Sequence, residues 1–131
     1  MRKLDEPGVP RHPPRVVVVD DDPILVEIYR IALEQDYQVS GFCHPDQALE
    51  HLRDHDADIL VTDYTMPGIN GLELSRLAKK MHPKIKVMMI SGTFNLVMGA
   101  VQDMTLDPVD KFLAKPFAAD DLLGCCHSMS Y

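Results

Sequence analysis

Five short apolar runs, separated by amphipathic or turn-rich segments, constrain the fold of this chain more than any other feature. The first run, Arg15–Val19, contains four consecutive valines, which is typical of a strand buried on both faces. Strands that alternate with helices indicate a parallel sheet covered on both faces. Five strand–helix units in 131 residues are too few for an eight-unit barrel. The sequence therefore predicts an α/β domain with an open, doubly wound, five-stranded parallel sheet.

The predicted elements follow one another with short connections. We expect strands at 15–19, 37–43, 59–61, 84–90 and 111–114, and helices at 23–35, 46–53, 72–81, 95–104 and 121–129. Asp22 followed by Pro23 is a favourable helix start, because it places a carboxylate at the N-cap and proline at the first helical position. Apolar residues recur at helical spacing in the segment that follows: Ile24, Leu25, Ile28, Tyr29, Ile31 and Ala32. Residues 1–14 are rich in proline and predict a flexible leader, so we assign the folded domain to residues 15–131.

Charge and composition exclude several classes of partner. The formal net charge is −7 and the pI is near 5.2, which argues against direct binding to nucleic acid or a membrane surface. No apolar run is long enough to span a bilayer, and no signal peptide is recognisable. Three cysteines, two of them adjacent, do not suggest a disulfide framework. We therefore expect a cytoplasmic protein.

Polar side chains follow four of the five predicted strands at the point where each strand ends. Asp20 and Asp21 follow the first, Asp63 the third, Ser91 the fourth and Lys115 the fifth. All of these residues should meet at one edge, because the carboxyl ends of parallel strands lie together and form the ligand-binding crevice of such sheets.

The predicted cluster is suited to phosphoryl transfer. Clustered carboxylates repel one another, and a divalent cation relieves that repulsion. All-oxygen ligands favour Mg²⁺, with Mn²⁺ as the other candidate. Lys115 and Ser91 could contact the oxygens of a phosphoryl group. Asp63, which is central in the set, could act as the nucleophile and form an aspartyl phosphate.

The segments VVVVDDDP, ILVTDYTMPGINGLEL, VMMISG and FLAKPF together resemble the receiver domain of two-component response regulators, over nearly everything from Arg15 onward. The resemblance implies a flavodoxin-like strand order, 2-1-3-4-5. It implies that Asp63 is phosphorylated by a histidine kinase or phosphotransfer partner. It also implies that Asp20, Asp21, Asp63 and the backbone carbonyl of Thr65 bind Mg²⁺.

The resemblance assigns the remaining roles as well. Ser91 and Phe112 would be the switch residues, Lys115 would contact the phosphate, and the Lys115–Pro116 bond would be cis. The domain would be a phospho-switch that catalyses only its own phosphorylation and dephosphorylation, and it would act on a downstream effector domain or protein. A homodimer could form through helix 4, strand 5 and helix 5. Phe112 stands where tyrosine is frequent, and the segment 105–111 lacks the usual glycine.

Alternatives remain open from the sequence alone. A phosphohydrolase could use an aspartyl-phosphate intermediate on a similar sheet, although such enzymes usually place a second Asp where this chain has Thr65. A receiver-like scaffold that binds partners without phosphorylation is the third reading.

His51 and His55 lie four residues apart on a predicted helix, but no third metal ligand is evident, so we expect a solvated helix face. The sequence identifies neither the kinase nor the output, and it fits a stand-alone regulator or part of a larger protein.

Overall fold

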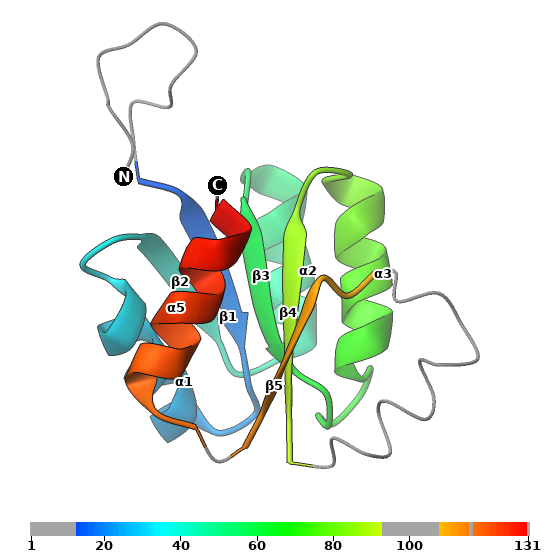
Figure 1. Cartoon of the computed structure of the whole chain (residues 1–131). Helices are drawn as coiled ribbons and strands as arrows, with labels where there is room; N and C mark the ends of the chain where they lie inside the picture. The colour runs from blue at the N-terminus through cyan, green and yellow to red at the C-terminus, as the bar shows by residue number, and fades with distance from the viewer. Residues whose placement is uncertain (1–12, 93–107, 116, 131) are drawn as a thin grey trace, which may run out of the picture.

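A single sheet of five parallel strands forms the centre of the molecule (Figure 1). The computed structural model describes residues 13–92, 108–115 and 117–130. The strands are β1 Arg15–Val19, β2 Gln38–Phe42, β3 Ile59–Asp63, β4 Lys86–Ser91 and β5 Lys111–Ala114. Their order in the sheet is β2-β1-β3-β4-β5, which confirms the expected doubly wound topology. Val17 pairs with Ser40 on one side and with Leu60 on the other, so the valine run lies inside the sheet.

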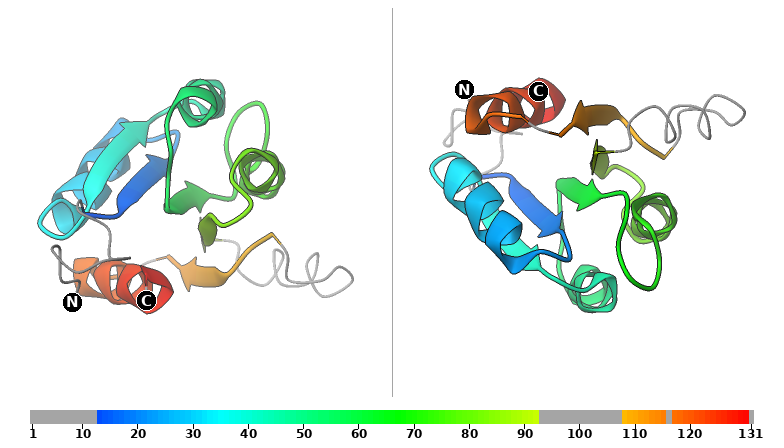
Figure 2. Two further views of the ribbon diagram at one scale, coloured as in Figure 1. Left: turned by 90° about the horizontal axis from the view of Figure 1, so that it is seen from above. Right: turned by 90° about the horizontal axis from the view of Figure 1, so that it is seen from below.

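Helices cover both faces of the sheet, as predicted. The described helices are α1 Pro23–Leu33, α2 Pro45–Asp54, α3 Gly71–Met81 and α5 Ala119–Ser130. Helices α1 and α5 lie on one face, and α2 and α3 lie on the other (Figure 2). Each face has its own apolar cluster, one containing Leu52 and Leu74, the other Leu33 and Leu122. The helix expected over 95–104 lies outside the described residues.

Helix α1 lies where it was expected, but apolar spacing did not identify its buried face. Its buried residues are Val26, Tyr29 and Leu33. Ile24, Ile28 and Ile31 are instead exposed, at 69%, 48% and 56%. The helix is apolar around most of its circumference, so the position of the sheet decides which side is buried.

The connection from β3 to α3 is shaped by three residues. Gly68 has φ = 86°, a left-handed conformation that glycine adopts without strain. The Asn70 side chain caps α3 by accepting a hydrogen bond from the Glu73 backbone N–H at 2.9 Å. A Cβ atom on Gly71 would lie 2.3 Å from the Asp63 carbonyl oxygen. Glycine therefore lets α3 begin directly against the end of β3.

Side-chain caps fix the starts of two further helices. Asp22 accepts a hydrogen bond from the Ile24 N–H at 2.9 Å, as its predicted role as N-cap of α1 requires. Asp121 reaches back and accepts one from the Ala118 N–H at 2.9 Å, so α5 begins without a Ser or Thr cap. Helix α5 is two residues longer at its start than expected. None of the described helices has the length and apolar character needed to cross a lipid bilayer.

Candidate functional site

Backbone hydrogen bonds to neighbouring strands hold the site residues at the carboxyl edge of the sheet. The Asp20 N–H donates to the Phe42 carbonyl at 3.2 Å, one residue beyond the end of β1. The Lys115 N–H donates to the Ser91 carbonyl at 3.0 Å in the same way. Asp63 is the last residue of β3 and is paired with Ile90 in β4. These side chains therefore start from a rigid frame.

Three carboxylates and one ammonium group converge at this edge. Oxygen atoms of Asp20, Asp21 and Asp63 all lie within 4.8 Å of one another. The Lys115 Nζ lies 3.5 Å from Asp20 Oδ2 and 3.5 Å from Asp63 Oδ1. Asp20 and Asp63 are buried, whereas Asp21 is exposed. The convergence predicted from the strand ends is thus present in the structure.

The two buried carboxyl groups are electrostatically frustrated. Burial raises the pKa of Asp63, and the nearby charge of Asp20 raises that pKa further, against the opposing effect of Lys115. Burial likewise raises the pKa of Asp20. The Asp22 N–H donates to Asp20 Oδ1 at 3.0 Å and lowers this pKa, but by less than burial raises it. One lysine does not compensate for three acids, so the site favours an additional cation.

The donor set fits a hard divalent metal ion. Asp20 Oδ2 is buried, and among the described residues it accepts no well-formed hydrogen bond; Lys115 lies 3.5 Å away, at ion-pair distance only. A buried oxygen that lacks a hydrogen bond is costly unless a cation or water contacts it. No other group of three acidic, histidine or cysteine side chains in the described part of the chain is arranged to share one ion. Oxygen ligands of this kind are those that Mg²⁺ prefers.

The structure places the other predicted residues in the loop after β3, on β4 and on β5. Ser91 is buried at the end of β4, next to the strand that carries Asp63. Thr65 is exposed in the loop after β3, and its carbonyl as a metal ligand stays a prediction. Phe112 is half-buried in β5 and packs against the apolar cluster beneath α2 and α3. Pro116 lies outside the described residues, and so does the expected cis bond.

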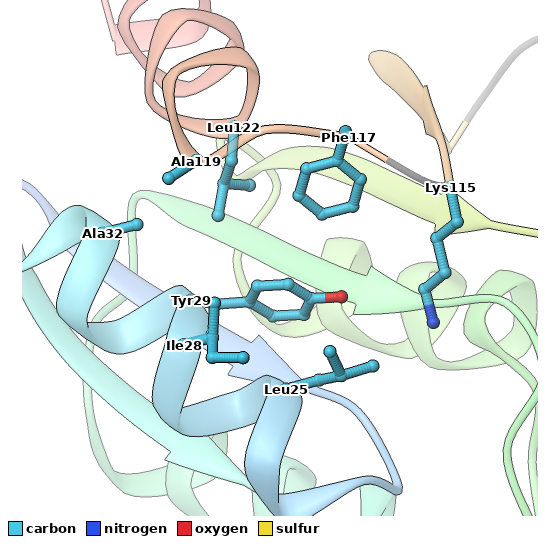
Figure 3. A pocket seen from close by; sticks show the side chains of 8 residues that line it. All are labelled: Leu25, Ile28, Tyr29, Ala32, Lys115, Phe117, Ala119 and Leu122. Atoms are coloured by element: carbon cyan, nitrogen blue, oxygen red, sulfur yellow. The ribbon is translucent and has the colours of Figure 1, made fainter.

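Tyr29 is a residue at this site that the sequence did not single out. Its ring stacks on Phe117, with 5.7 Å between the ring centroids, and its hydroxyl points toward Lys115 (Figure 3). Burial and the charges of Asp20 and Asp63 raise its pKa, so the phenol stays protonated. Helical spacing marked Tyr29 as an apolar position of α1 but could not show that its hydroxyl approaches the acidic site.

An apolar hollow of about 320 Å³ lies next to the acidic site, between α1 and α5. The Tyr29 ring forms one wall, and Leu25, Ile28 and Leu122 also line it (Figure 3). The Lys115 side chain borders both the hollow and the carboxylates. The hollow therefore connects an exposed apolar part of α1 with the charged edge of the sheet.

An open doubly wound sheet with an acidic, lysine-bordered cluster at its carboxyl edge defines a flavodoxin-like α/β domain suited to a metal ion. The sequence profile of the response regulator receiver domain matches residues 16–126. The chain therefore belongs to the receiver domain family of two-component response regulators. This is a family of signalling domains and not of classical enzymes.

Relatives of known function agree with this assignment. The response regulator receiver protein CpdR of Brucella abortus is 33% identical over 111 residues, which cover 84% of this chain and 91% of the relative. The C4-dicarboxylate transport transcriptional regulatory protein DctD of Rhizobium meliloti is 35% identical over 113 residues. That match covers 84% of this chain but only 24% of DctD, so the chain spans about a quarter of this larger regulator.

A solved structure of a response regulator agrees with the same family assignment. The response regulator TrrA of Thermotoga maritima, solved in complex with Mg²⁺ and BeF, superimposes with a TM-score of 0.76 at 25% identity. The match covers 88% of this chain and 98% of TrrA. The chain thus matches nearly the whole of TrrA.

Proposed function

We propose that this chain is a phosphorylation-controlled switch in which the Asp63 carboxylate accepts a phosphoryl group from a phosphohistidine. The donor would be a histidine kinase or a phosphotransfer protein. The observation that carries the proposal is the convergence of Asp20, Asp21, Asp63 and Lys115 at one edge of the sheet. An Asp63 oxygen would attack phosphorus as the phosphorus–nitrogen bond to the donor breaks, which leaves an aspartyl phosphate.

The residues present fit a Mg²⁺ ion, with Mn²⁺ as a substitute. Asp20, Asp21, Asp63 and the Thr65 carbonyl would hold it, and the buried Asp20 oxygen without a hydrogen bond supports this assignment. When bound, the ion would neutralise carboxylate charge and draw phosphoryl oxygens toward the site. The Mg²⁺ and BeF bound in TrrA are consistent with the same chemistry here.

The chain's own residues would orient and stabilise the phosphoryl group. The ammonium group of Lys115, which already lies 3.5 Å from Asp63, would pair with a phosphoryl oxygen. The Ser91 hydroxyl would donate a hydrogen bond to another oxygen. Movement of Ser91 would free space for Phe112 to turn inward, and β5 would repack as the population of two states shifts.

We expect the phosphodonor to dock at the hollow between α1 and α5. A partner that delivers a phosphoryl group to Asp63 must pass close to Lys115, which borders the hollow. Ile24, Ile28 and Ile31 are exposed on the helix that forms one side of it. An apolar helix of the donor could bury these side chains while its histidine reaches Asp63. A downstream effector and a dimer through helix 4, β5 and α5 remain part of the proposal, although helix 4 lies outside the described residues.

The direct test is phosphorylation by a small phosphodonor. The chain should gain one phosphate by intact mass when incubated with acetyl phosphate and Mg²⁺, and EDTA should suppress the gain. The Asp63→Asn variant should gain none. Glu50→Gln, which removes an exposed charge on α2, is the matched control and should react like the wild type. An unchanged wild-type mass, or equal labelling of Asp63→Asn, would contradict the proposal. Multiple turnovers of a phosphate ester would favour the phosphohydrolase instead.

A further inference from the structure

The buried Asp20 carboxylate depends on a cation that it shares with Asp63. Lys115 Nζ lies 3.5 Å from Asp20 Oδ2 and 3.5 Å from Asp63 Oδ1, and both distances exceed that of a well-formed hydrogen bond. The Asp22 N–H donates to Asp20 Oδ1, but among the described residues no well-formed hydrogen bond reaches Oδ2. A phosphoryl group on Asp63 would draw the ammonium group of Lys115 away from Asp20. The Asp20 carboxylate would then need another donor, because an unpaired buried charge is costly.

Tyr29 brings a hydroxyl group from α1 to this part of the site. Its side chain is buried, with only 3% of the residue exposed. Its hydroxyl points toward Lys115 (Figure 3). Burial raises the pKa of this phenol, as do the charges of Asp20 and Asp63 and the approach of the hydroxyl to the Asp20 side chain. A protonated phenol beside an ionised carboxylate can only donate to it, because the carboxylate has no hydrogen to give.

Packing sets the direction of the Tyr29 ring and leaves it some freedom. The ring stacks on Phe117, with 5.7 Å between the ring centroids and 27° between the planes. Phe117 follows Lys115 by two residues, so the stack ties the ring to the segment that carries the ammonium group. The ring also borders the hollow of about 320 Å³ between α1 and α5. A small tilt of the ring can therefore bring the hydroxyl closer to the carboxylate without displacing a packed side chain.

We propose that Tyr29 is a positioning residue for phosphoryl transfer, whose hydroxyl donates to the Asp20 carboxylate when Lys115 turns to the phosphoryl group on Asp63. This inference rests on the proposed phosphorylation of Asp63. The phenol keeps its hydrogen, so no proton enters or leaves the site. An ionised carboxylate offers about four lone pairs, so Asp20 can contact a metal ion and accept this hydrogen at the same time. The hydroxyl thus makes it easier for Lys115 to leave Asp20.

Substitutions can separate the ring of Tyr29 from its hydroxyl. Tyr29→Phe keeps the ring that stacks on Phe117 and removes only the hydroxyl, whereas Tyr29→Leu removes both. Tyr37→Phe is the matched control, because Tyr37 is a buried tyrosine of the same apolar cluster and directly precedes β2 at the amino edge of the sheet. If Tyr29 acted only through the packing of its ring, Tyr29→Phe would behave like the wild type and only Tyr29→Leu would be impaired.

The first test is a double-mutant cycle in urea unfolding at pH 7.5 with EDTA, which needs no phosphorylation. Lys115→Met imitates the departure of the ammonium group, so the Tyr29 hydroxyl should then donate fully to Asp20. Tyr29→Phe should therefore raise the unfolding equilibrium constant about tenfold more in Lys115→Met than in the wild-type background, because a hydrogen bond to a charged group is lost. An equal effect of Tyr29→Phe in both backgrounds would overturn the inference.

The second test is the rate at which acetyl phosphate and saturating Mg²⁺ add one phosphate, followed by intact mass. Tyr29→Phe should react about tenfold more slowly than the wild type, and Tyr37→Phe should react at the wild-type rate. In the Lys115→Met background Tyr29→Phe should not slow the reaction further, because no ammonium group is left to release. A wild type that gains no phosphate would refute the phosphorylation and the role of Tyr29 with it. A reactive wild type with an equally fast Tyr29→Phe variant would overturn only this inference.

Discussion

Replacing Asp63 by asparagine should stabilise the metal-free fold. The substitution keeps the shape of the side chain and removes one negative charge. In the structure, that charge faces two other carboxylates within 4.8 Å and one ammonium group at 3.5 Å. The free energy of unfolding should rise because the substitution removes two repulsions and only one attraction.

The magnitude can be worked from these distances. With an effective dielectric constant of about 20, a carboxylate repulsion taken at the outer limit of 4.8 Å costs about 3.5 kcal/mol, and the Lys115 attraction at 3.5 Å gives about 4.7 kcal/mol. The repulsions exceed the attraction by about 2 kcal/mol. Asp21 is exposed and Lys115 is partly so, and solvent screening reduces both contributions. We therefore expect Asp63→Asn to gain about 1–2 kcal/mol in free energy of unfolding.

The gain in stability of Asp63→Asn should be largest at neutral pH and should shrink in acid. The pKa of Asp63 is raised in the folded state by burial and by Asp20. Such a carboxyl group destabilises the fold at pH values above its folded pKa, because the unfolded chain releases the proton more easily. Below the unfolded pKa of about 3.9 both states hold the proton and the penalty is gone. The advantage of the variant should thus be full at pH 7.5 and should shrink as the pH falls through the folded pKa.

Urea unfolding in EDTA, followed by circular dichroism, measures the effect. Glu50→Gln should leave the midpoint unchanged, which separates the local effect from the change in net charge. Mg²⁺ should stabilise the wild type more than Asp63→Asn, since a bound ligand adds RT ln(1 + [L]/Kd) to stability. A variant no more stable than the wild type at pH 7.5, or a gain that grows as the pH falls, would refute the electrostatic reasoning.

Four further predictions concern charge, packing and the reactivity of one thiol. Lys115→Met should destabilise the metal-free fold by about 2–4 kcal/mol in urea unfolding, because buried carboxylates lose their paired cation. Gly71→Ala should cost about 2–3 kcal/mol by the same measurement, since its Cβ would lie 2.3 Å from the Asp63 carbonyl oxygen. Gly124→Ala should instead gain about 0.5–1 kcal/mol, because its added Cβ would meet no atom within 4 Å outside its own stretch of helix backbone. Burial raises the pKa of Cys126 to about 12, so a thiol reagent at pH 8 should label this cysteine only when the chain unfolds.

The sheet and the convergence at its edge could be predicted because both depend on local pattern and one topological rule. The runs at Arg15–Val19 and Lys111–Ala114 have the predicted bounds in the structure. Parallel strands place their carboxyl ends at one edge, so Asp20, Asp63 and Lys115 had to meet there once the sheet was inferred. No knowledge of side-chain packing was needed for that step.

Tertiary details could not be predicted in the same way. Helix α1 has apolar residues on several faces, and only the position of the sheet determines that Val26 and Leu33 are buried while Ile24 is exposed. The stacking of Tyr29 on Phe117 joins two segments far apart in the chain, and neither motif nor periodicity indicates it. The sequence also does not distinguish Asp20 from Asp21. The backbone bond from Asp20 to Phe42 fixes the first at the buried end of β1, while the second is exposed.

The same geometry explains how a change of charge at Asp63 can act on the rest of the fold. The carboxylates are held together against their repulsion by backbone bonds between strands and by the apolar clusters on both faces. Lys115 contacts Asp63 through its side chain and Ser91 through its backbone N–H, which donates to the Ser91 carbonyl at 3.0 Å. A new charge on Asp63 must therefore alter the ion pairs of Lys115, and through them the junction of β4 and β5. Because β5 is an edge strand with half-buried side chains, as β2 is, it can move at a smaller loss of packing than the buried strands β1, β3 and β4.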